Sequence, residues 1–362
     1  MMRALVIEPS GDLWGSERAL LDMLDNVRGM DLAVCCPPET PLQRELTKRH
    51  IRAIPYYVYG LHKKRKWHRL RAAFGVLRSC LQFRPDVIYL NQSGSYKIVL
   101  PAAWLLRLPI VAHVRIFEDA AYLARQNPDE SRLRGLIAIS AAIESEIRRF
   151  PSLDVVPVHR IYDAYVPTPN EVHSNAATTV KRIACIGRIV PVKGQDVLVK
   201  ALGALVRPGF NIECLIVGEG DKDFLRRLTA LAIGARILHS VQLTGFVADV
   251  VPLLRTCVVL VCPSHREPLG RVIFEAWDAG IVPIAYAGSG GAAEIIAASQ
   301  GGLLYEAQTP DALAKVLQEA LELERERSER LVRNGRAWMA RNCSPGPYAE
   351  SITRILSDAC AK

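Results

Sequence analysis

The fold is decided by a short stretch in the second half of the chain, RIACIGRIVPVKG at residues 182–194. Its first five residues are mostly apolar without strict polar alternation, which is typical of a parallel strand covered on both faces. The following loop lies between Gly187 and Gly194 and carries two cations. Because doubly wound sheets bind ligands in loops at the carboxyl ends of strands, this stretch predicts an α/β fold with a ligand-binding loop.

The same pattern repeats on both sides of this stretch. Strand-like runs alternate with helical patterns along the chain, which indicates parallel sheets. The runs cover residues 4–7, 32–36, 53–57, 87–90, 110–113 and 136–139 in the first half, and 182–186, 212–217, 241–243, 258–261, 282–285 and 302–305 in the second.

Length and composition fit two domains. The chain has 362 residues and half of them are apolar, which suffices for two cores at roughly 100–200 residues per domain. The segment 163–179 is rich in Pro, Asn, Thr and Ser and lacks a hydrophobic period, so we place the linker there. We expect Rossmann-like domains over residues 1–165 and 180–342, and a final helical segment, 343–362, whose return to the first domain the sequence leaves open.

Charge is concentrated in the first half. The formal net charge is +9, and residues 1–165 carry 24 Lys and Arg against 17 Asp and Glu. The densest basic run is HKKRKWHRLR at residues 62–71. Two interpretations have equal weight: contact with anionic lipid headgroups or polyphosphate, and a solvated loop that enters a helix. Nucleic acid is not expected as a partner, because no DNA- or RNA-binding motif accompanies the charge.

The cysteines indicate a reducing compartment. There are nine, an odd number, and none has C-x-x-C spacing. Several lie in apolar runs, so we interpret them as reduced, buried thiols of a cytoplasmic protein. No signal peptide precedes the first strand, and the most apolar stretch, 98–117, is interrupted by Pro101 and Arg107. Its longest charge-free part is shorter than the ~20 residues of a membrane span, so any membrane contact is expected to be peripheral.

The loop at residues 187–194 suits a diphosphate. Arg188 can hold two phosphate oxygens at once, and Lys193 adds a point charge. The alternative is a surface turn whose cations are solvated.

A second loop, EPLGRVIFEA at residues 267–276, follows the strand at 258–261. Gly270 opens a helical pattern, and free N–H groups at a helix N-terminus attract phosphate. Glu267 and Glu275 could accept hydrogen bonds from the hydroxyls of a donor sugar and a ribose. Alternatively Glu275 caps its helix or pairs outward, although its apolar neighbours indicate burial.

Three further signals are weak alone. Residues 287–294, AGSGGAAE, form a Gly-rich turn before a helical pattern. Gly15 and Ser16 follow the first strand and could donate N–H groups to phosphate, but the G-x-G-x-x-G spacing of a dinucleotide fingerprint is absent. His113 and Arg115 lie at the end of a strand, where a lone histidine is more often structural.

Taken in order and spacing, the motifs of the second half resemble those of glycosyltransferase family 4. They are GR and KG within 187–194, GEG at 218–220, GF at 245–246, the E-x7-E of 267–275, and GG with Glu294 at 290–294. WGSE at 14–17, His113 and IAIS at 137–140 extend the resemblance to the first half. It implies a GT-B fold, in which two Rossmann-like doubly wound parallel-sheet domains face a central cleft. It also implies retaining, metal-independent transfer from a nucleotide diphosphate sugar, which is a co-substrate rather than a cofactor.

The resemblance also implies roles for individual residues. Arg188 and Lys193 would neutralise the diphosphate, Glu267 would contact the donor sugar, and Glu275 would bind the ribose. Further contacts would come from Gly187, from the backbone of Leu269 and Gly270, from Gly245 and Phe246 beside the base, from His113 at the sugar, and from Gly15 and Ser16 at the phosphates. The chain departs from the family pattern at Ser16, Leu269 and Ala293, and the segment 160–163 lacks the usual Asn-Gly at the hinge side.

The acceptor is expected to be a saccharide or a lipid-linked molecule, as in bacterial cell-surface polysaccharide assembly at the inner face of the membrane. No metal site is expected, because Asp221-Lys222-Asp223 has Asp-x-Asp spacing but looks like the start of a helix. Three alternatives stay open: a nucleotide-sugar epimerase or hydrolase, an inactive sugar-binding module, and a nicotinamide-dependent dehydrogenase, which the missing fingerprint disfavours.

Overall fold

A computed structural model describes residues 1–56, 66–126, 132–169, 180–205 and 211–361. The chain divides into two compact units. Unit 1 comprises Met1–Val166 together with Cys343–Lys362, and unit 2 comprises Pro167–Asn342.

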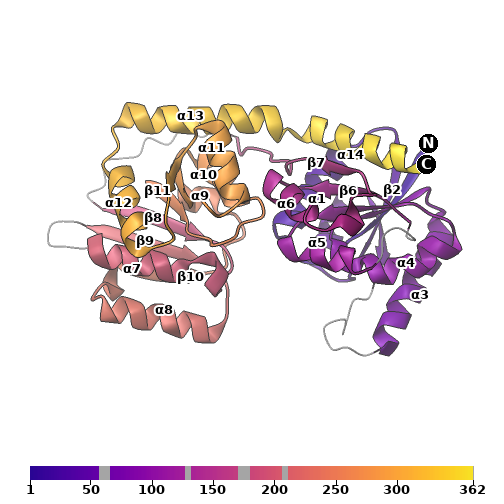
Figure 1. Ribbon diagram of the computed structural model, residues 1–362, viewed down its shortest axis with the longest axis horizontal. Helices are drawn as coiled ribbons and strands as arrows, with labels where there is room; N and C mark the ends of the chain where they lie inside the picture. The colour runs from indigo at the N-terminus through magenta and orange to yellow at the C-terminus, as the bar shows by residue number, and fades with distance from the viewer. Residues whose placement is uncertain (57–65, 127–131, 170–179, 206–210, 362) are drawn as a thin grey trace. The chain divides into compact units, whose positions relative to one another are not determined.

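Unit 1 is built on a parallel sheet of seven strands in the order β3-β2-β1-β4-β5-β6-β7 (Figure 1). Its strands are β1 (Met2–Ile7), β2 (Met30–Cys36), β3 (Arg52–Pro55), β4 (Val87–Leu90), β5 (Ile110–Val114), β6 (Leu133–Ala138) and β7 (Val158–Arg160). Its helices are α1 (Gly15–Asn26), α2 (Pro41–Lys48), α3 (Lys66–Phe83), α4 (Tyr96–Leu105), α5 (Phe117–Ala124), α6 (Ala141–Ile147) and α14 (Pro345–Cys360).

Unit 2 repeats this plan with a parallel sheet of six strands in the order β10-β9-β8-β11-β12-β13. Its strands are β8 (Lys181–Ile186), β9 (Ile212–Val217), β10 (Val241–Gly245), β11 (Val259–Cys262), β12 (Val282–Tyr286) and β13 (Leu303–Tyr305). Its helices are α7 (Gln195–Leu205), α8 (Lys222–Gly234), α9 (Val251–Leu254), α10 (Arg271–Ala279), α11 (Gly291–Ser299), α12 (Pro310–Leu321) and α13 (Arg325–Asn342).

The strand order positions the functional loops. In unit 1, β2 and β3 lie on one side of β1, and the chain then crosses over so that β4 lies on the other side of β1. In unit 2, β8 and β11 have the same relation. Ligands of doubly wound sheets bind at such switch points, outside the carboxyl ends of the strands. The predicted α/β class with two Rossmann-like parallel-sheet domains is therefore confirmed.

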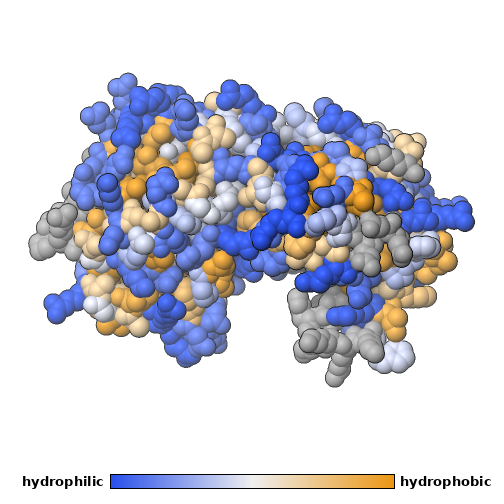
Figure 2. Space-filling model, viewed as in Figure 1, coloured by the Kyte–Doolittle hydropathy of each residue, from blue (hydrophilic) through white to orange (hydrophobic). Residues whose placement is uncertain are grey.

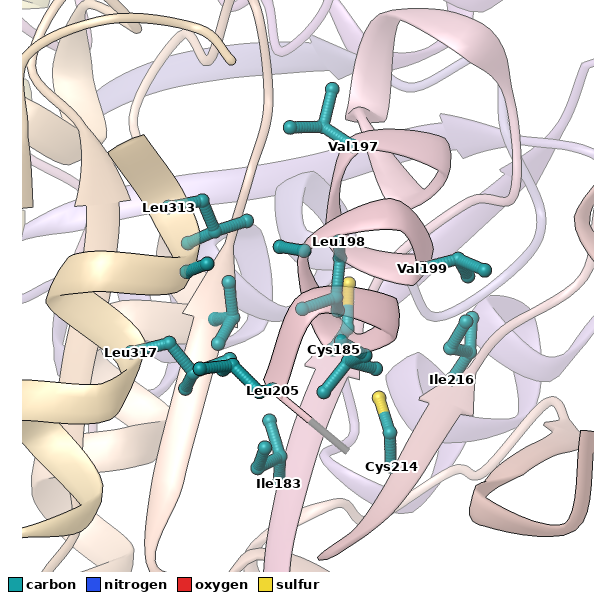
Figure 3. Packing of buried hydrophobic residues seen from close by; sticks show 14 of the residues in the cluster. Ile183, Cys185, Val197, Leu198, Val199, Leu205, Cys214, Ile216, Leu313 and Leu317 are labelled. Atoms are coloured by element: carbon teal, nitrogen blue, oxygen red, sulfur yellow. The ribbon is translucent and has the colours of Figure 1, made fainter. Parts of the chain in front are cut away.

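Each sheet is buried between helices because its central strands are apolar on both faces. In unit 2, Leu198 and Leu205 of α7 and Leu313 of α12 lie over Ile183 and Cys185 of β8 (Figure 3). In unit 1, one face of α14 packs on the sheet and on α1. The buried residues of that face include Tyr348, Ala349, Ile352, Ile355, Leu356 and Ala359.

Three details differ from the expectations. The short edge strand β7, only three residues long, was not predicted, because Val158 is its only apolar residue and is followed by His159 and Arg160. The linker was predicted to begin at Asp163, but Asp163, Ala164 and Tyr165 are buried in unit 1. The nine cysteines are free and eight are buried, whereas Cys360 in the last turn of α14 is exposed.

Among the described residues, no helix is both long and apolar enough to cross a bilayer.

Candidate functional site

The loop after β8 lies against the loop after β11. Gly194 has φ +70, and a Cβ there would stand 2.0 Å from the carbonyl oxygen of Pro263, so only glycine allows this approach. The N–H of His265 donates to the carbonyl oxygen of Val192 at 2.9 Å. This packing brings the two sequence motifs, far apart in the chain, to one end of the sheet.

Lys193 and Glu267 form an ion pair at this junction. Lys193 Nζ lies 2.6 Å from Glu267 Oε2, and the hydroxyl of Ser264 donates to the same oxygen at 2.9 Å. The side chains are only 22% and 11% exposed. Burial opposes the charge of Lys193, but the attraction of the Glu267 carboxylate outweighs it and raises the pKa of the ammonium. Lys193 is therefore held charged in a fixed position.

Arg188 differs from Lys193 in its surroundings. It is exposed, and no partner holds its guanidinium within the described part of the chain. Only its backbone is fixed, since Gln195 Nε2 donates to the Arg188 carbonyl oxygen at 2.9 Å. The charge of Arg188 is close enough to Lys193 to work against the raised pKa of that ammonium. The two cations thus share one neighbourhood, with Arg188 available to an anion.

The Gly-rich turn after β12 supports the loop that carries Glu267. The N–H of Glu267 donates to the carbonyl oxygen of Ser289 at 2.6 Å, and the N–H of Gly291 returns a bond to the Glu267 carbonyl oxygen at 2.8 Å. A Cβ at Gly291 would lie 2.3 Å from the carbonyl oxygen of Pro268. The turn, weak as a signal by itself, therefore fixes the backbone of Glu267. The Ser289 hydroxyl is buried and has no hydrogen-bond partner within the described residues.

Helix α10 begins immediately after Gly270 and carries Glu275. Gly270 has φ +86, and its hypothetical Cβ would meet Ala292 Cβ at 2.7 Å, so the tight entry into α10 requires glycine. Leu269 and Glu275 are buried. The helix is anchored by Trp277, whose indole donates to the Gly301 carbonyl oxygen at 2.7 Å. Glu275 thus has a rigid support one and a half turns into the helix.

The remaining predicted residues of unit 2 lie at the same edge of the sheet. Gly187 directly follows β8, and Gly245 is the last residue of β10. Both have positive φ. The N–H of Gly218 donates to the carbonyl oxygen of Gly245 at 2.8 Å. Phe246 is 48% exposed. Asp221 caps α8 by accepting from the N–H groups of Asp223 and Phe224, as expected for a helix start.

In unit 1, Gly15 is the first residue of α1 and Ser16 the second. No side chain caps the N-terminus of this helix at Trp14. Gln92 Nε2 lies 3.4 Å from the Ser16 hydroxyl, and Asn91 Nδ2 lies 3.3 Å from its carbonyl oxygen. These contacts fix the start of α1 beside the ends of β1 and β4.

His113 is fully buried in β5. Its Nδ1 lies 2.7 Å from the Tyr89 hydroxyl and 3.3 Å from Arg115 Nη2. Because arginine can only donate, Nδ1 is the acceptor and Nε2 carries the proton. Burial, and next the charge of Arg115, hold the pKa of His113 well below its usual value, so the ring is neutral. Nε2 is buried without a hydrogen-bond partner in the described chain.

Sequence reasoning missed a buried polar network around these residues. Arg115 donates to Asp163 at 2.7 and 2.8 Å and to Asn91 at 2.8 and 2.9 Å. Glu8 accepts from Asn91, Gln92 and the N–H of Ser10. Burial, and next the charge of Glu17, raise the pKa of Glu8 to about 8. Glu8 and Asn91 each directly follow an apolar strand, which is the signal that could have found them.

Two family models together match most of the chain. The model of the glycosyl transferases group 1 matches residues 169–338, and that of the glycosyl transferase 4-like domain matches residues 17–162. These matches do not favour the dehydrogenase or binding-module alternatives.

Relatives and solved structures agree with these matches. A GDP-mannose-dependent alpha-(1-6)-phosphatidylinositol monomannoside mannosyltransferase of Mycobacterium tuberculosis is 34% identical over 166 residues, 43% of this chain and 42% of the relative. The matched region thus spans under half the length of that relative. A D-inositol 3-phosphate glycosyltransferase of Gordonia bronchialis is 27% identical over 78% of this chain and 69% of its own.

The fold has close counterparts as well. The crystal structure of HepE of Anabaena in complex with UDP and glucose superposes with a TM-score of 0.82 at 20% identity, covering 99% of this chain and 100% of that one. With both halves matched to paired domain families, and with two Rossmann-like sheets in the structure, the chain belongs to the group 1, family 4-like glycosyltransferases of GT-B fold.

Proposed function

We propose that this chain transfers a sugar from a nucleoside diphosphate sugar to an acceptor, with retention of anomeric configuration and without a metal ion. The observation that carries the proposal is the Lys193–Glu267 ion pair beside the exposed Arg188, at the switch point of the unit 2 sheet. A donor diphosphate bound there would meet the ammonium of Lys193, which folding has already placed, and the guanidinium of Arg188, which is available to it.

The chemistry needs positive charge where the leaving group develops negative charge. When the bond between sugar and phosphate breaks, the departing diphosphate gains charge, and preorganised cations stabilise that charge more than they stabilise the ground state. Arg188 can bind two phosphate oxygens through its planar guanidinium. Lys193 cannot swing away, because Glu267 and the surrounding loops hold it. Together they supply the role that a metal ion has in other transferases.

Glu267 is better suited to orient the sugar than to attack it. Its Oε2 already accepts from Lys193 and Ser264, which lowers its nucleophilicity. Oε1 accepts no hydrogen bond within the described part of the chain and is free for a sugar hydroxyl. This arrangement supports attack by the acceptor on the same face from which the diphosphate leaves, with no covalent sugar–enzyme intermediate.

The other donor contacts follow the family pattern. In unit 2 we assign Glu275 to the ribose, Gly187, Leu269 and Gly270 to backbone contacts, and Gly245 and Phe246 to the base. In unit 1 we assign Gly15 and Ser16 to the phosphates and His113 to the sugar. The protonated Nε2 of His113 makes it a hydrogen-bond donor rather than a general base.

The acceptor is proposed to be a saccharide or a lipid-linked molecule. The mycobacterial relative is named for a phosphatidylinositol mannoside acceptor, and unit 1 includes the more basic half of the chain. We place the process in bacterial cell-surface polysaccharide assembly, in the cytoplasm at the inner face of the membrane. Within the basic run 62–71, residues 62–65 lie outside the described residues.

A thermal-shift screen against nucleoside diphosphate sugars tests the donor site, because a ligand that binds the folded state raises Tm. We expect one donor to stabilise the wild type and to lose this effect in Arg188→Ala. A failure of every donor to stabilise the protein, or equal stabilisation of the variant, would overturn the proposal. With the donor known, NMR of the product should show the donor's anomeric configuration, and turnover should survive EDTA.

A further inference from the structure

Helix α3 carries large apolar side chains on two opposite faces. Its inner face packs against unit 1 through Ala72, Val76, Cys80 and Phe83, all buried. Its outer face carries Trp67, Leu70, Phe74 and Leu81, which are 83%, 62%, 68% and 57% exposed. A helix at the surface of a globular domain normally has polar residues on its outer face, so this second apolar stripe indicates an interaction surface.

The spacing of these side chains places them on one face of α3. From Trp67 they follow at three, seven and fourteen residues, and such positions fall on one face of an α-helix. The hydropathy surface shows hydrophobic side chains over α3 among hydrophilic ones (Figure 2). The unit 1 fold does not use this face, since the core residues of α3 lie on the opposite side.

The neighbouring helix α4 also carries exposed apolar side chains. It packs alongside α3 and ends in Trp104 and Leu105, which are 56% and 69% exposed. The guanidinium of Arg132 lies 5.7 Å from the centre of the Trp104 ring. We call these six side chains the outer α3/α4 surface: Trp67, Leu70, Phe74, Leu81, Trp104 and Leu105.

The charged side chains within α3 and α4 are all cationic. Neither α3 nor α4 contains an Asp or Glu, while Arg69, Arg71 and Arg78 of α3 and Lys97 of α4 are exposed. Aromatic and aliphatic side chains bordered by cations match an anionic bilayer, whose headgroups attract the cations while its interface takes up the apolar groups. A second copy fits less well, because a two-fold contact through this face would bring the same cations together.

We propose that the outer α3/α4 surface docks unit 1 on an anionic lipid bilayer, with the apolar side chains in the interface and the flanking arginines on lipid phosphates. This docking does not depend on the donor-binding residues of unit 2. It places the contact on a described apolar surface, whereas the sequence prediction rested on the charges of the basic run 62–71 alone.

Vesicle co-sedimentation of the full chain tests the proposal, using vesicles rich in phosphatidylglycerol and vesicles of phosphatidylcholine alone. The wild type should bind the anionic vesicles, and Leu70→Gln/Phe74→Gln should bind at least about tenfold more weakly, because two apolar side chains no longer enter the interface. The matched control is Ile233→Gln/Leu238→Gln, two residues of unit 2 that are 57% and 48% exposed, and it should bind like the wild type. Arg71→Gln/Arg78→Gln should weaken binding to the anionic vesicles only.

A second readout does not depend on these variants folding. In the wild type, tryptophan emission should shift to the blue on anionic vesicles and be quenched by brominated lipid, and Trp67→Phe should reduce both effects. Absent vesicle binding by the wild type, or equal binding by Leu70→Gln/Phe74→Gln, overturns the proposal. The proposal is also overturned if the wild type is a dimer, Leu70→Gln/Phe74→Gln is a monomer, and the two proteins bind vesicles equally. Donor thermal shifts should be the same in all these variants, so failure of docking and failure of the donor site can be told apart.

Discussion

Each unit has an arginine just beyond the carboxyl end of an interior strand, Arg115 after β5 and Arg188 after β8, but the two side chains have different partners. In unit 1, Arg115 is buried and bonds to Asp163, Asn91 and His113. In unit 2, Arg188 is exposed, and its guanidinium has no partner among the described residues. Both follow a central strand of a doubly wound sheet, so position at a strand end does not by itself distinguish them.

The difference distinguishes an arginine that stabilises the fold from an arginine that is available to a ligand. A buried cation whose donors are all engaged holds protein segments together, and removing it leaves its partners unpaired. A cation fixed only through its backbone, beside a second cation held by a carboxylate, retains its binding capacity for an anion. We therefore assign Arg115 to the fold of unit 1 and Arg188 to the donor. The predictions below test this contrast.

The largest expected effect is on stability. Arg115→Ala leaves the buried Asp163 carboxylate without its cation, which should lower the free energy of unfolding by about 3–5 kcal/mol. Chemical denaturation measures the loss. The control is Arg149→Ala, which removes an exposed ion pair with Glu146 and should change stability by less than about 1 kcal/mol. A similar small change for Arg115→Ala would show that its network does not hold unit 1.

Arg188→Ala should have the opposite profile. Because the side chain is exposed, the variant should unfold at the wild-type Tm. Its turnover should fall by about 10²–10³, the loss that follows removal of one preorganised stabilising group, or roughly 2.7–4 kcal/mol. Steady-state kinetics with the donor found by the thermal screen measure the effect. Near-normal kcat would contradict the role of Arg188.

A smaller effect is expected at the entry to α10. Gly270→Ala forces a side chain into the left-handed region, where strain costs about 1–3 kcal/mol, and its Cβ would press on Ala292 at 2.7 Å. Gly280→Ala is the matched control, since Gly280 has φ +84 and only a flexible Arg336 end at 3.6 Å. Gly270→Ala should lose more stability than the control and should also weaken donor binding, which Gly280→Ala should not. Equal effects would show that the close approach to Ala292 is unimportant.

The smallest effect concerns pH. Burial, with the Glu17 charge second, raises the pKa of Glu8 from 4.5 to about 8, so between these values the folded state holds a proton that the unfolded state lacks. Stability should therefore fall as pH rises, by about 1 kcal/mol between pH 7 and pH 8. Glu8→Gln removes this titration, and its denaturation midpoint should vary less over that interval. Parallel pH profiles for the two proteins would rule out Glu8 as the titrating group.

Much of the fold could be predicted from the sequence, because apolar runs without alternation mark central parallel strands. The exceptions have local causes. The edge strand β7 contains only one apolar residue, so it gives no hydrophobic pattern. Asp163 was assigned to the linker because the residues after it are rich in Pro, Asn, Thr and Ser, and its ion pair with Arg115 depends on the tertiary structure.

The residues of the candidate site could likewise be predicted only in part. Arg188, Lys193, Glu267 and Gly270 could be chosen because each lies between an apolar strand and a helical pattern. The contact between Lys193 and Glu267 could not, since it depends on the sheet order that sets β8 beside β11. Glu8 and Asn91 were missed because a single polar residue after a strand matches no motif.

The central claim, that the loop at residues 187–194 binds the donor diphosphate, is tested most directly by calorimetric titration with UDP and GDP. The wild type and Arg226→Ala, a control that removes an exposed arginine of α8, should bind one of them with equal affinity. Arg188→Ala should bind it at least about tenfold more weakly, since a bidentate charge-assisted contact is lost. Equal affinity in all three proteins would contradict the account.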